Sequence, residues 1–207
     1  MITIDIAKIL GLCPWYTPEK AEAVVADTGR AHITALAALD LPISVFDRLW
    51  LVLREDVIGA NILKQFTYDC AEYVLNHERL WGREPDARSL KALSVWRLYD
   101  AGNATDTELA SARLDADAAV SDAWTAASRL GVISFAARGH PLEEAKMAYA
   151  NYCHARFSYS AAVLAVVVLS SRYITVAHLR GIDYMMYDGL VEHLRCMLEQ
   201  AAGVQIK

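Results

Sequence analysis

Histidine and cysteine are the residues of this sequence best suited to hold a metal ion. His193 and Cys196 are three residues apart, a spacing that places both on one face of a helix, and Cys153 is followed directly by His154. Structural zinc sites normally use close ligand pairs such as Cys-x₂-Cys or His-x₃-His, and the sequence has neither. We therefore expect no metal and no cofactor, with reduced thiols in the core and partly exposed histidines.

Common catalytic motifs are missing from the sequence. It has no glycine-rich phosphate loop, no G-x-S-x-G turn and no His-Glu-x-x-His pair. A Cys–His nucleophile built on Cys70 or Cys153 needs surroundings that favour the thiolate, and no sequence feature selects either residue. Cys70 falls on an apolar helical stripe, which favours packing. We expect a protein that is not an enzyme.

Tyrosine is concentrated in the last third of the chain, where it favours a protein-binding surface. Tyrosine and tryptophan combine apolar area with a polar tip, which suits interfaces. The alternative is that these rings pack between helices with their hydroxyl groups at the surface. Three aspartates on a predicted solvated helix face complete the candidate set. The candidate protein-binding residues are Tyr149, Tyr152, Tyr159, Tyr184, Tyr187, Asp115, Asp117 and Asp122, with Tyr149 and Tyr152 the first choices.

The elements that position these residues are predicted to be helices. Alanine, the best helix former, occurs 34 times among 207 residues, and only 5 Pro and 10 Gly interrupt the chain. The prediction is an all-α, single-domain helical bundle of about eight helices, with a small N-terminal helical cap. Residues 1–40 form the cap, residues 42–131 the helical core, and residues 141–203 the Tyr- and Val-rich C-terminal helices.

Capping signals and apolar periodicity predict where the helices lie. Thr17 and Gly29 bracket one helix, Asp86 can cap another, and Thr105 with Glu108 forms a capping box. Residues 132–137 are either a further turn of helix or a buried connector. The Val-rich run at 161–169 could be a strand, but a fully buried helix is favoured, with a break near residue 158 left open. The predicted helices are 4–10, 18–28, 31–39, 44–53, 57–77, 86–101, 105–130, 141–169 and 183–202.

Charge and hydropathy indicate which partners and which cell compartment to expect. The net charge of −5 argues against nucleic-acid binding, because phosphate-binding surfaces usually carry an excess of Lys and Arg. The longest apolar run has nine residues, whereas a membrane-spanning helix needs about 20. The N-terminal segment has no basic start and carries Asp5 within its apolar stretch, unlike a signal peptide. We expect a cytoplasmic protein that does not enter a membrane.

Four segments carry a family resemblance. They are residues 47–54 (DRLWLVLR), 66–72 (FTYDCAE), 86–93 (DARSLKAL) and 103–110 (NATDTELA). Together they resemble a family of phage and bacterial immunity proteins, in which a D-x-L-W-x-x-L-R motif precedes a cysteine-bearing helix and a later capped turn leads into an Ala-rich helical tail. The resemblance covers residues 42–129 and ends where the Tyr- and Val-rich region begins. It implies a helical, non-catalytic protein and assigns no functional residue.

These observations favour a non-catalytic protein-binding module. The expected class is a phage or mobile-element accessory protein that inhibits a toxin, nuclease or host-defence complex by masking a surface. An acidic inhibitor would be steered electrostatically toward a basic partner. Two alternatives stay open: a small helical enzyme or ligand-binding protein with a Tyr/His/Cys-lined pocket, and a phage structural or scaffolding protein. A homodimer also stays open.

Overall fold

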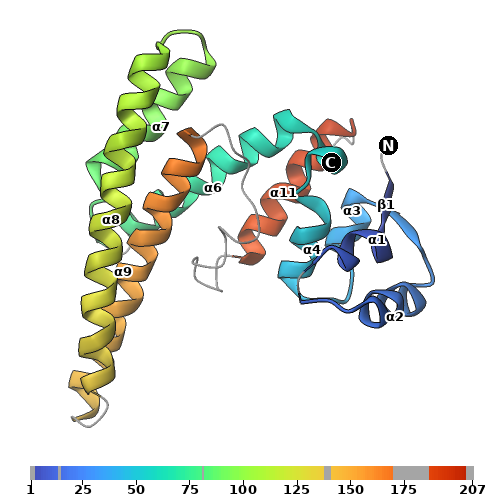
Figure 1. The fold of residues 1–207 in the computed structure, drawn as a ribbon, viewed down its shortest axis with the longest axis horizontal. Coiled ribbons are helices and arrows are strands. Elements are labelled where there is room, and N and C mark those ends of the chain that lie inside the picture. The colour runs from blue at the N-terminus through green and yellow to red at the C-terminus, as the bar shows by residue number, and fades with distance from the viewer. Residues whose placement is uncertain (1–2, 14, 81, 138–140, 170–186, 204–207) are drawn as a thin grey trace. The chain divides into compact units, whose positions relative to one another are not determined.

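The structure, a computed structural model, describes residues 3–13, 15–80, 82–137, 141–169 and 187–203. These residues form ten helices and one two-stranded sheet, which confirms the all-α prediction (Figure 1). Among them, residues 3–66 and 187–203 belong to a first compact unit and residues 67–169 to a second. Each unit is described by itself, and the single-domain organisation stays a prediction. No helix of the described part is long and apolar enough to span a bilayer.

The first unit begins with a small sheet that the sequence did not predict. Strand β1 (Thr3–Asp5) pairs antiparallel with β2 (His32–Thr34), and Ile4 lies opposite Ile33. The predicted helix starts at residues 4 and 31 were therefore wrong. Both isoleucines are buried, and β-branched side chains suit a pleated surface better than the first turn of a helix.

Capping residues set where the first helices begin and end. Helices α1 (Ile6–Gly11) and α3 (Ala35–Leu39) begin after Asp5 and Thr34, whose side chains accept backbone N–H bonds. Helix α2 (Pro18–Thr28) begins after Thr17 and ends at Gly29, where φ is 64°. Those two ends of α2 were predicted correctly, because a Thr cap and a left-handed glycine are local signals.

One predicted helix of the first unit is interrupted. Residues 57–77 were expected to form a single helix, but α5 (Glu55–Ile58) stops at Gly59, where φ is 79°, and α6 (Ala60–Leu80) starts after it. Only glycine adopts that backbone conformation freely. The predicted apolar stripe is confirmed within α6, where Phe66, Cys70 and Val74 are fully buried. Helices α4 (Val45–Val52) and α11 (Tyr187–Ala201) complete the unit.

A buried carboxylate connects the N-terminal segment to α4. Asp47 accepts hydrogen bonds from Trp15 Nε1 at 2.9 Å, Tyr16 Oη at 3.0 Å and Ser44 Oγ at 2.6 Å. The Trp15 ring also packs edge-on against Trp50, with the centroids 5.3 Å apart. Burial and the neighbouring Asp47 raise the pKa of Tyr16 to about 12. One side chain therefore fixes the segment after α1 against α4.

The second unit consists of the rest of α6 and three further helices, α7 (Ala87–Asp100), α8 (Asp106–Ala136) and α9 (Leu142–Leu169). The predicted Asp86 cap and the capping box of Thr105 with Glu108 are both confirmed. Helix α9 runs unbroken through Ser158, and its Val-rich stretch is mostly buried. Tyr68 of α6 stacks on Trp96 of α7 at 5.0 Å, which fastens those two helices together.

Helix α8 differs from its prediction at the C-terminal end. It continues past Gly131 to Ala136, and Val132 and Phe135 are 72% and 69% exposed. The expectation that α8 ends near residue 130 was wrong. Of the two options for residues 132–137, the further turn of helix is confirmed and the buried connector was wrong. The buried face of α8 is instead an alanine stripe, formed by Ala112, Ala116, Ala119 and Ala127.

Replacing Asp47 with alanine should destabilise the protein by about 2 kcal/mol, because three donors lose their shared acceptor. Urea unfolding followed by tryptophan fluorescence measures this loss. The exposed Asp117 provides the matched control, and Asp117→Ala should change the unfolding free energy by less than about 0.5 kcal/mol. Equal effects of the two substitutions would contradict the role assigned to Asp47.

Candidate functional site

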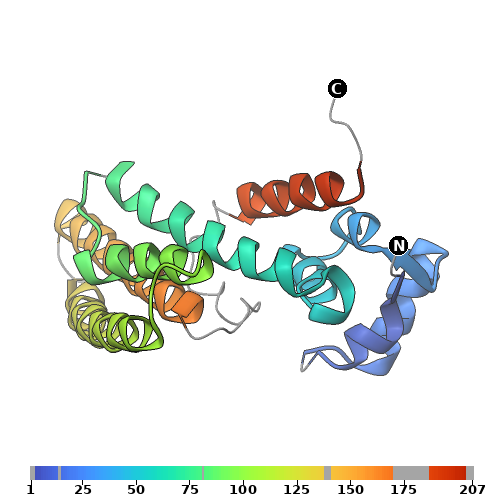
Figure 2. The same ribbon diagram turned by 90° about the horizontal axis from the view of Figure 1, so that it is seen from above.

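Two ion pairs place α7 along the first part of α8. Arg88 binds Asp122 at 2.9 Å and Lys91 binds Asp115 at 2.8 Å. Since α7 has 14 residues and α8 has 31, their lengths are about 21 Å and about 46 Å. The C-terminal half of α8 therefore runs beyond α7 (Figure 1). Helix α9 lies at its side (Figures 1 and 2).

These ion pairs change the interpretation of the predicted acidic face. Asp115 and Asp122 each bind a cation of α7, and Asp117 lies 4.0 Å from Arg113 of its own helix. Exposed pairs of this kind contribute little to stability, but they neutralise the carboxylates locally. The three aspartates are solvated, as predicted, and they serve contacts within the chain.

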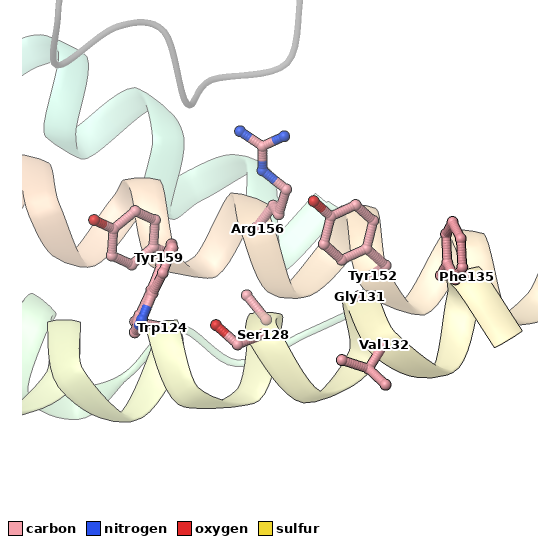
Figure 3. A pocket seen from close by; sticks show the side chains of 9 residues that line it. Trp124, Ser128, Gly131, Val132, Phe135, Tyr152, Arg156 and Tyr159 are labelled. Carbon is pink, nitrogen blue, oxygen red and sulfur yellow. The ribbon is translucent and has the colours of Figure 1, made fainter.

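Beyond α7, helices α8 and α9 form a surface pocket of about 520 Å³ (Figure 3). Most of its walls are aromatic or small apolar side chains. We call it the aromatic groove. Its lining consists of Trp124, Ala127, Ser128, Gly131, Val132 and Phe135 from α8, and Tyr152, Arg156 and Tyr159 from α9.

Helical spacing explains why these residues share one face. Trp124, Ser128, Val132 and Phe135 follow one another at intervals of three or four residues, as do the three residues from α9. Tyr149 lies three residues before Tyr152, so it extends the same stripe of α9, and its side chain is 61% exposed. The groove is therefore built from one regular stripe on each helix.

Ring contacts hold α8 and α9 together at two places along the groove. At one end, Trp124 and Tyr159 meet with their centroids 5.3 Å apart and their planes at 54°. Further along, the Tyr152 ring lies against Gly131, where an added Cβ would be only 3.1 Å from Tyr152 Cε2. Figure 3 shows Arg156 between the two tyrosines, at the α9 rim. Its guanidinium carbon lies 5.9 Å from the centre of the Tyr152 ring.

The structure separates the predicted tyrosines into three groups. Tyr152 and Tyr159 line the groove, and Tyr149 lies next to it on the surface. Tyr187 is buried in the first unit, where its ring meets Phe46 at 4.8 Å, so its proposed place on a binding surface was wrong. Tyr184 lies outside the described residues.

Sequence reasoning missed the α8 side of the groove. Trp124, Val132 and Phe135 were not among the candidates: Trp124 was given no role, and residues 132–137 were left as either a turn of helix or a buried connector. A usable signal was present in their spacing, which matches one helical face if α8 is extended past Gly131. The exposed fraction of Trp124, 58%, shows that this face points outward.

The side chains lining the groove suit binding better than proton transfer. They offer aromatic faces, hydroxyl groups and one cation, and they include no carboxylate, thiol or imidazole. In the described residues no group of three or more His, Cys, Asp or Glu side chains is arranged to hold a metal. The two His/Cys pairs suggested by the sequence fall in different units.

The cysteines do not all follow the prediction. Cys13 and Cys70 are buried, as expected for core thiols, and burial raises the pKa of Cys70 well above its ordinary value. Cys153 is exposed and Cys196 is partly exposed, so a core position was wrong for these two.

A buried carboxyl positions α9 beside α6. Glu78 is 4% exposed and accepts a hydrogen bond from the Ser158 hydroxyl, next to Tyr159 of the groove. Burial raises the pKa of Glu78, and this exceeds the opposing effects of the Ser158 hydrogen bond and of Arg83. The contact between Glu78 and Ser158 therefore sets the position of α9 at the end of the groove where Tyr159 and Trp124 meet.

Comparison of the chain with protein-family models, with curated proteins and with solved structures finds no match. Membership of the immunity-protein family consequently stays a prediction. The function has to be argued from the groove itself.

Glu78→Gln should gain stability relative to the wild type as the pH rises from about 4 to about 7. The pKa of Glu78 is raised above 4.5, so its contribution is present at low pH and is lost as the pH rises through the raised pKa. Urea unfolding across this range measures the difference, with Glu143→Gln as the control for loss of an exposed carboxylate. A difference that does not change with pH would contradict the burial of Glu78.

Gly131→Ala should fail to give the stabilisation that Gly→Ala normally brings to a helix interior, about 1 kcal/mol. The new methyl group would press on the Tyr152 ring and force it to shift. In a Tyr152→Ala background the full gain should return, and a double-mutant cycle by thermal unfolding measures this coupling. Equal gains in both backgrounds would show that the ring does not lie against Gly131.

Proposed function

We propose that this protein is a non-catalytic protein-binding module and that the aromatic groove is its binding face. The wider role proposed is that of a phage or mobile-element accessory protein, which inhibits a toxin, nuclease or host-defence complex by masking a surface. The groove supports the binding role. The resemblance of residues 42–129 to immunity proteins supports the wider role.

The observation that carries the proposal is the outward position of large apolar side chains on α8 and α9. A hairpin of two helices cannot enclose its own apolar residues, and a stable layer architecture needs a further element to cover them. In the described chain α7 does not extend along this part of α8, and Val132, Phe135 and Tyr149 are exposed. A contiguous exposed apolar patch of this kind marks an interaction site.

The composition and area of the groove agree with a protein interface. Tryptophan, tyrosine and arginine are the residues that most often dominate binding energy, and all three line it. An aromatic side chain carries about 150–250 Å², so Trp124, Phe135 and Tyr149 together expose roughly 300–450 Å². That is about half of the roughly 800 Å² that each partner contributes to a standard interface.

The proposed binding face is the aromatic groove and not the surface that carries the three aspartates. The acidic surface was expected to meet a basic partner, but Asp115 and Asp122 already pair with Lys91 and Arg88. The net charge of −5 still favours fast encounter with a basic protein. Specific contact is assigned to the groove.

Affinity capture from extracts of the native cells, with mass spectrometry, tests the proposal. Phe135→Ser should remove the specifically captured protein, because a polar side chain replaces an apolar anchor. Leu114→Ser is the matched control, since Leu114 is an exposed apolar residue of the same helix outside the groove, at 71% exposure. It should capture the same protein as the wild type.

Both substituted residues are exposed, so both variants should unfold within a few degrees of the wild type. If Phe135→Ser and Leu114→Ser capture the same proteins, the groove is not the binding face. If the wild type captures no protein in excess of a resin control, the proposed function fails.

A further inference from the structure

The groove contains one charged side chain, that of Arg156. It lies between Tyr152 and Tyr159 in the sequence of α9, and its guanidinium rests near the Tyr152 ring. In the described part of the chain Arg156 has no carboxylate within ion-pair distance. Three other arginines of the same unit bind carboxylates: Arg88 with Asp86 and Asp122, Arg97 with Glu72, and Arg113 with Asp117. Among the described residues the exposed Arg129 of α8, like Arg156, has no carboxylate within ion-pair distance.

This contrast matters because the chain has an excess of acidic residues, with 25 Asp and Glu against 20 Lys and Arg. Arg156 is exposed at the rim of the groove, and its guanidinium carbon lies 5.9 Å from the centre of the Tyr152 ring. A hydrogen bond between a guanidinium and a carboxylate is stronger than one between neutral groups. Arg156 is therefore placed to bind an acidic group that a partner brings to the groove.

The length of the groove indicates the shape of the occupant. Trp124 and Phe135 are 11 residues apart on α8, which corresponds to about 16 Å along the helix axis. Apolar residues at positions i, i+4, i+7 and i+11 of a partner helix span the same length. Laying an amphipathic helix into an apolar groove is a recurrent mode of recognition, and here it would complete a three-helix layer.

A second copy of this chain fits the groove less well. In a two-fold arrangement the same patch meets itself. If the two-fold axis passed through the middle of the stripe from Tyr149 to Tyr159, the two copies of Arg156 would lie near each other. Like charges brought close together oppose association. The charge of the groove thus favours a different protein that presents a carboxylate at the position of Arg156.

We propose that the occupant of the aromatic groove is an amphipathic helix of a partner protein, bound by apolar anchors between Trp124 and Phe135 and by a carboxylate on Arg156. This inference rests on the proposed function, since it names the partner segment of the same groove. It adds a charge requirement that the proposed function does not contain.

The test is a selection from a surface-displayed library of helical peptides. Leucine is fixed at positions i, i+4, i+7 and i+11, and the neighbouring positions are random. Full-length wild-type protein should enrich Asp or Glu at the positions flanking the central leucines. Arg156→Glu should enrich Lys or Arg at the same positions and should bind the wild-type selected peptides at least about tenfold more weakly.

Arg129→Glu is the matched control, because Arg129 is an exposed arginine of α8 that does not line the groove. It should keep the wild-type preference. If all three proteins enrich the same charges while Phe135→Ser abolishes binding, the groove binds helices but the assignment of Arg156 is wrong. If Phe135→Ser leaves binding unchanged, or no peptide is enriched, both this inference and helix binding in the groove fail.

Light scattering coupled to size-exclusion chromatography tests the rival occupant. The wild type should be monomeric at the concentrations used for the selection. A wild-type dimer that becomes a monomer in Phe135→Ser would mean that a second copy fills the groove, and that result would overturn the inference.

Discussion

The packing of α8 through alanine is the constraint on which the second unit depends. Ala112, Ala116, Ala119 and Ala127 are the buried residues of a helix of 31 residues. Side chains of one carbon let neighbouring helices approach closely, so α8 packs against α7 and α9 without large core residues. The large apolar residues of α8 are consequently left on its outer side, where Trp124, Val132 and Phe135 form one wall of the aromatic groove. The close helix packing and the exposed apolar face both follow from having alanine on the buried side of α8.

The two halves of α8 differ in how many charged residues they carry. In its first half, Asp115 and Asp122 bind Lys91 and Arg88 and so align α7 with α8. In its second half, residues 123–136 carry a single charge, that of Arg129. The surface of α8 changes from charged to apolar just after Asp122, which pairs with Arg88 near the start of α7. The part of the hairpin that lacks α7 is thus also the part that lacks solubilising charge.

Local signals made much of the fold predictable. Caps at Thr17, Asp86 and Thr105 act through hydrogen bonds within one turn, so the sequence alone determined those helix starts. The strand at β1 and the break at Gly59 were missed, because the first depends on Ile4 pairing with the distant Ile33 and the second on one backbone angle. The sequence predicted the α9 side of the groove and missed the α8 side. The tyrosines of α9 stood out by composition, whereas Trp124 and Phe135 gained meaning only once α8 was seen to continue past Gly131.

The exposure of the α8 wall has a consequence for how this protein can diverge. The side chains of Trp124, Val132 and Phe135 are 58%, 72% and 69% exposed, so substitutions there remove little core packing and can follow a change of partner. The alanines beneath them cannot grow without separating the helices. Descendants of this chain should therefore share the small residues of α8 while differing in the groove, and their common origin would be visible in the spacing of buried alanines. The exposed side of α8 would then differ with the partner, and its buried side would show the common origin.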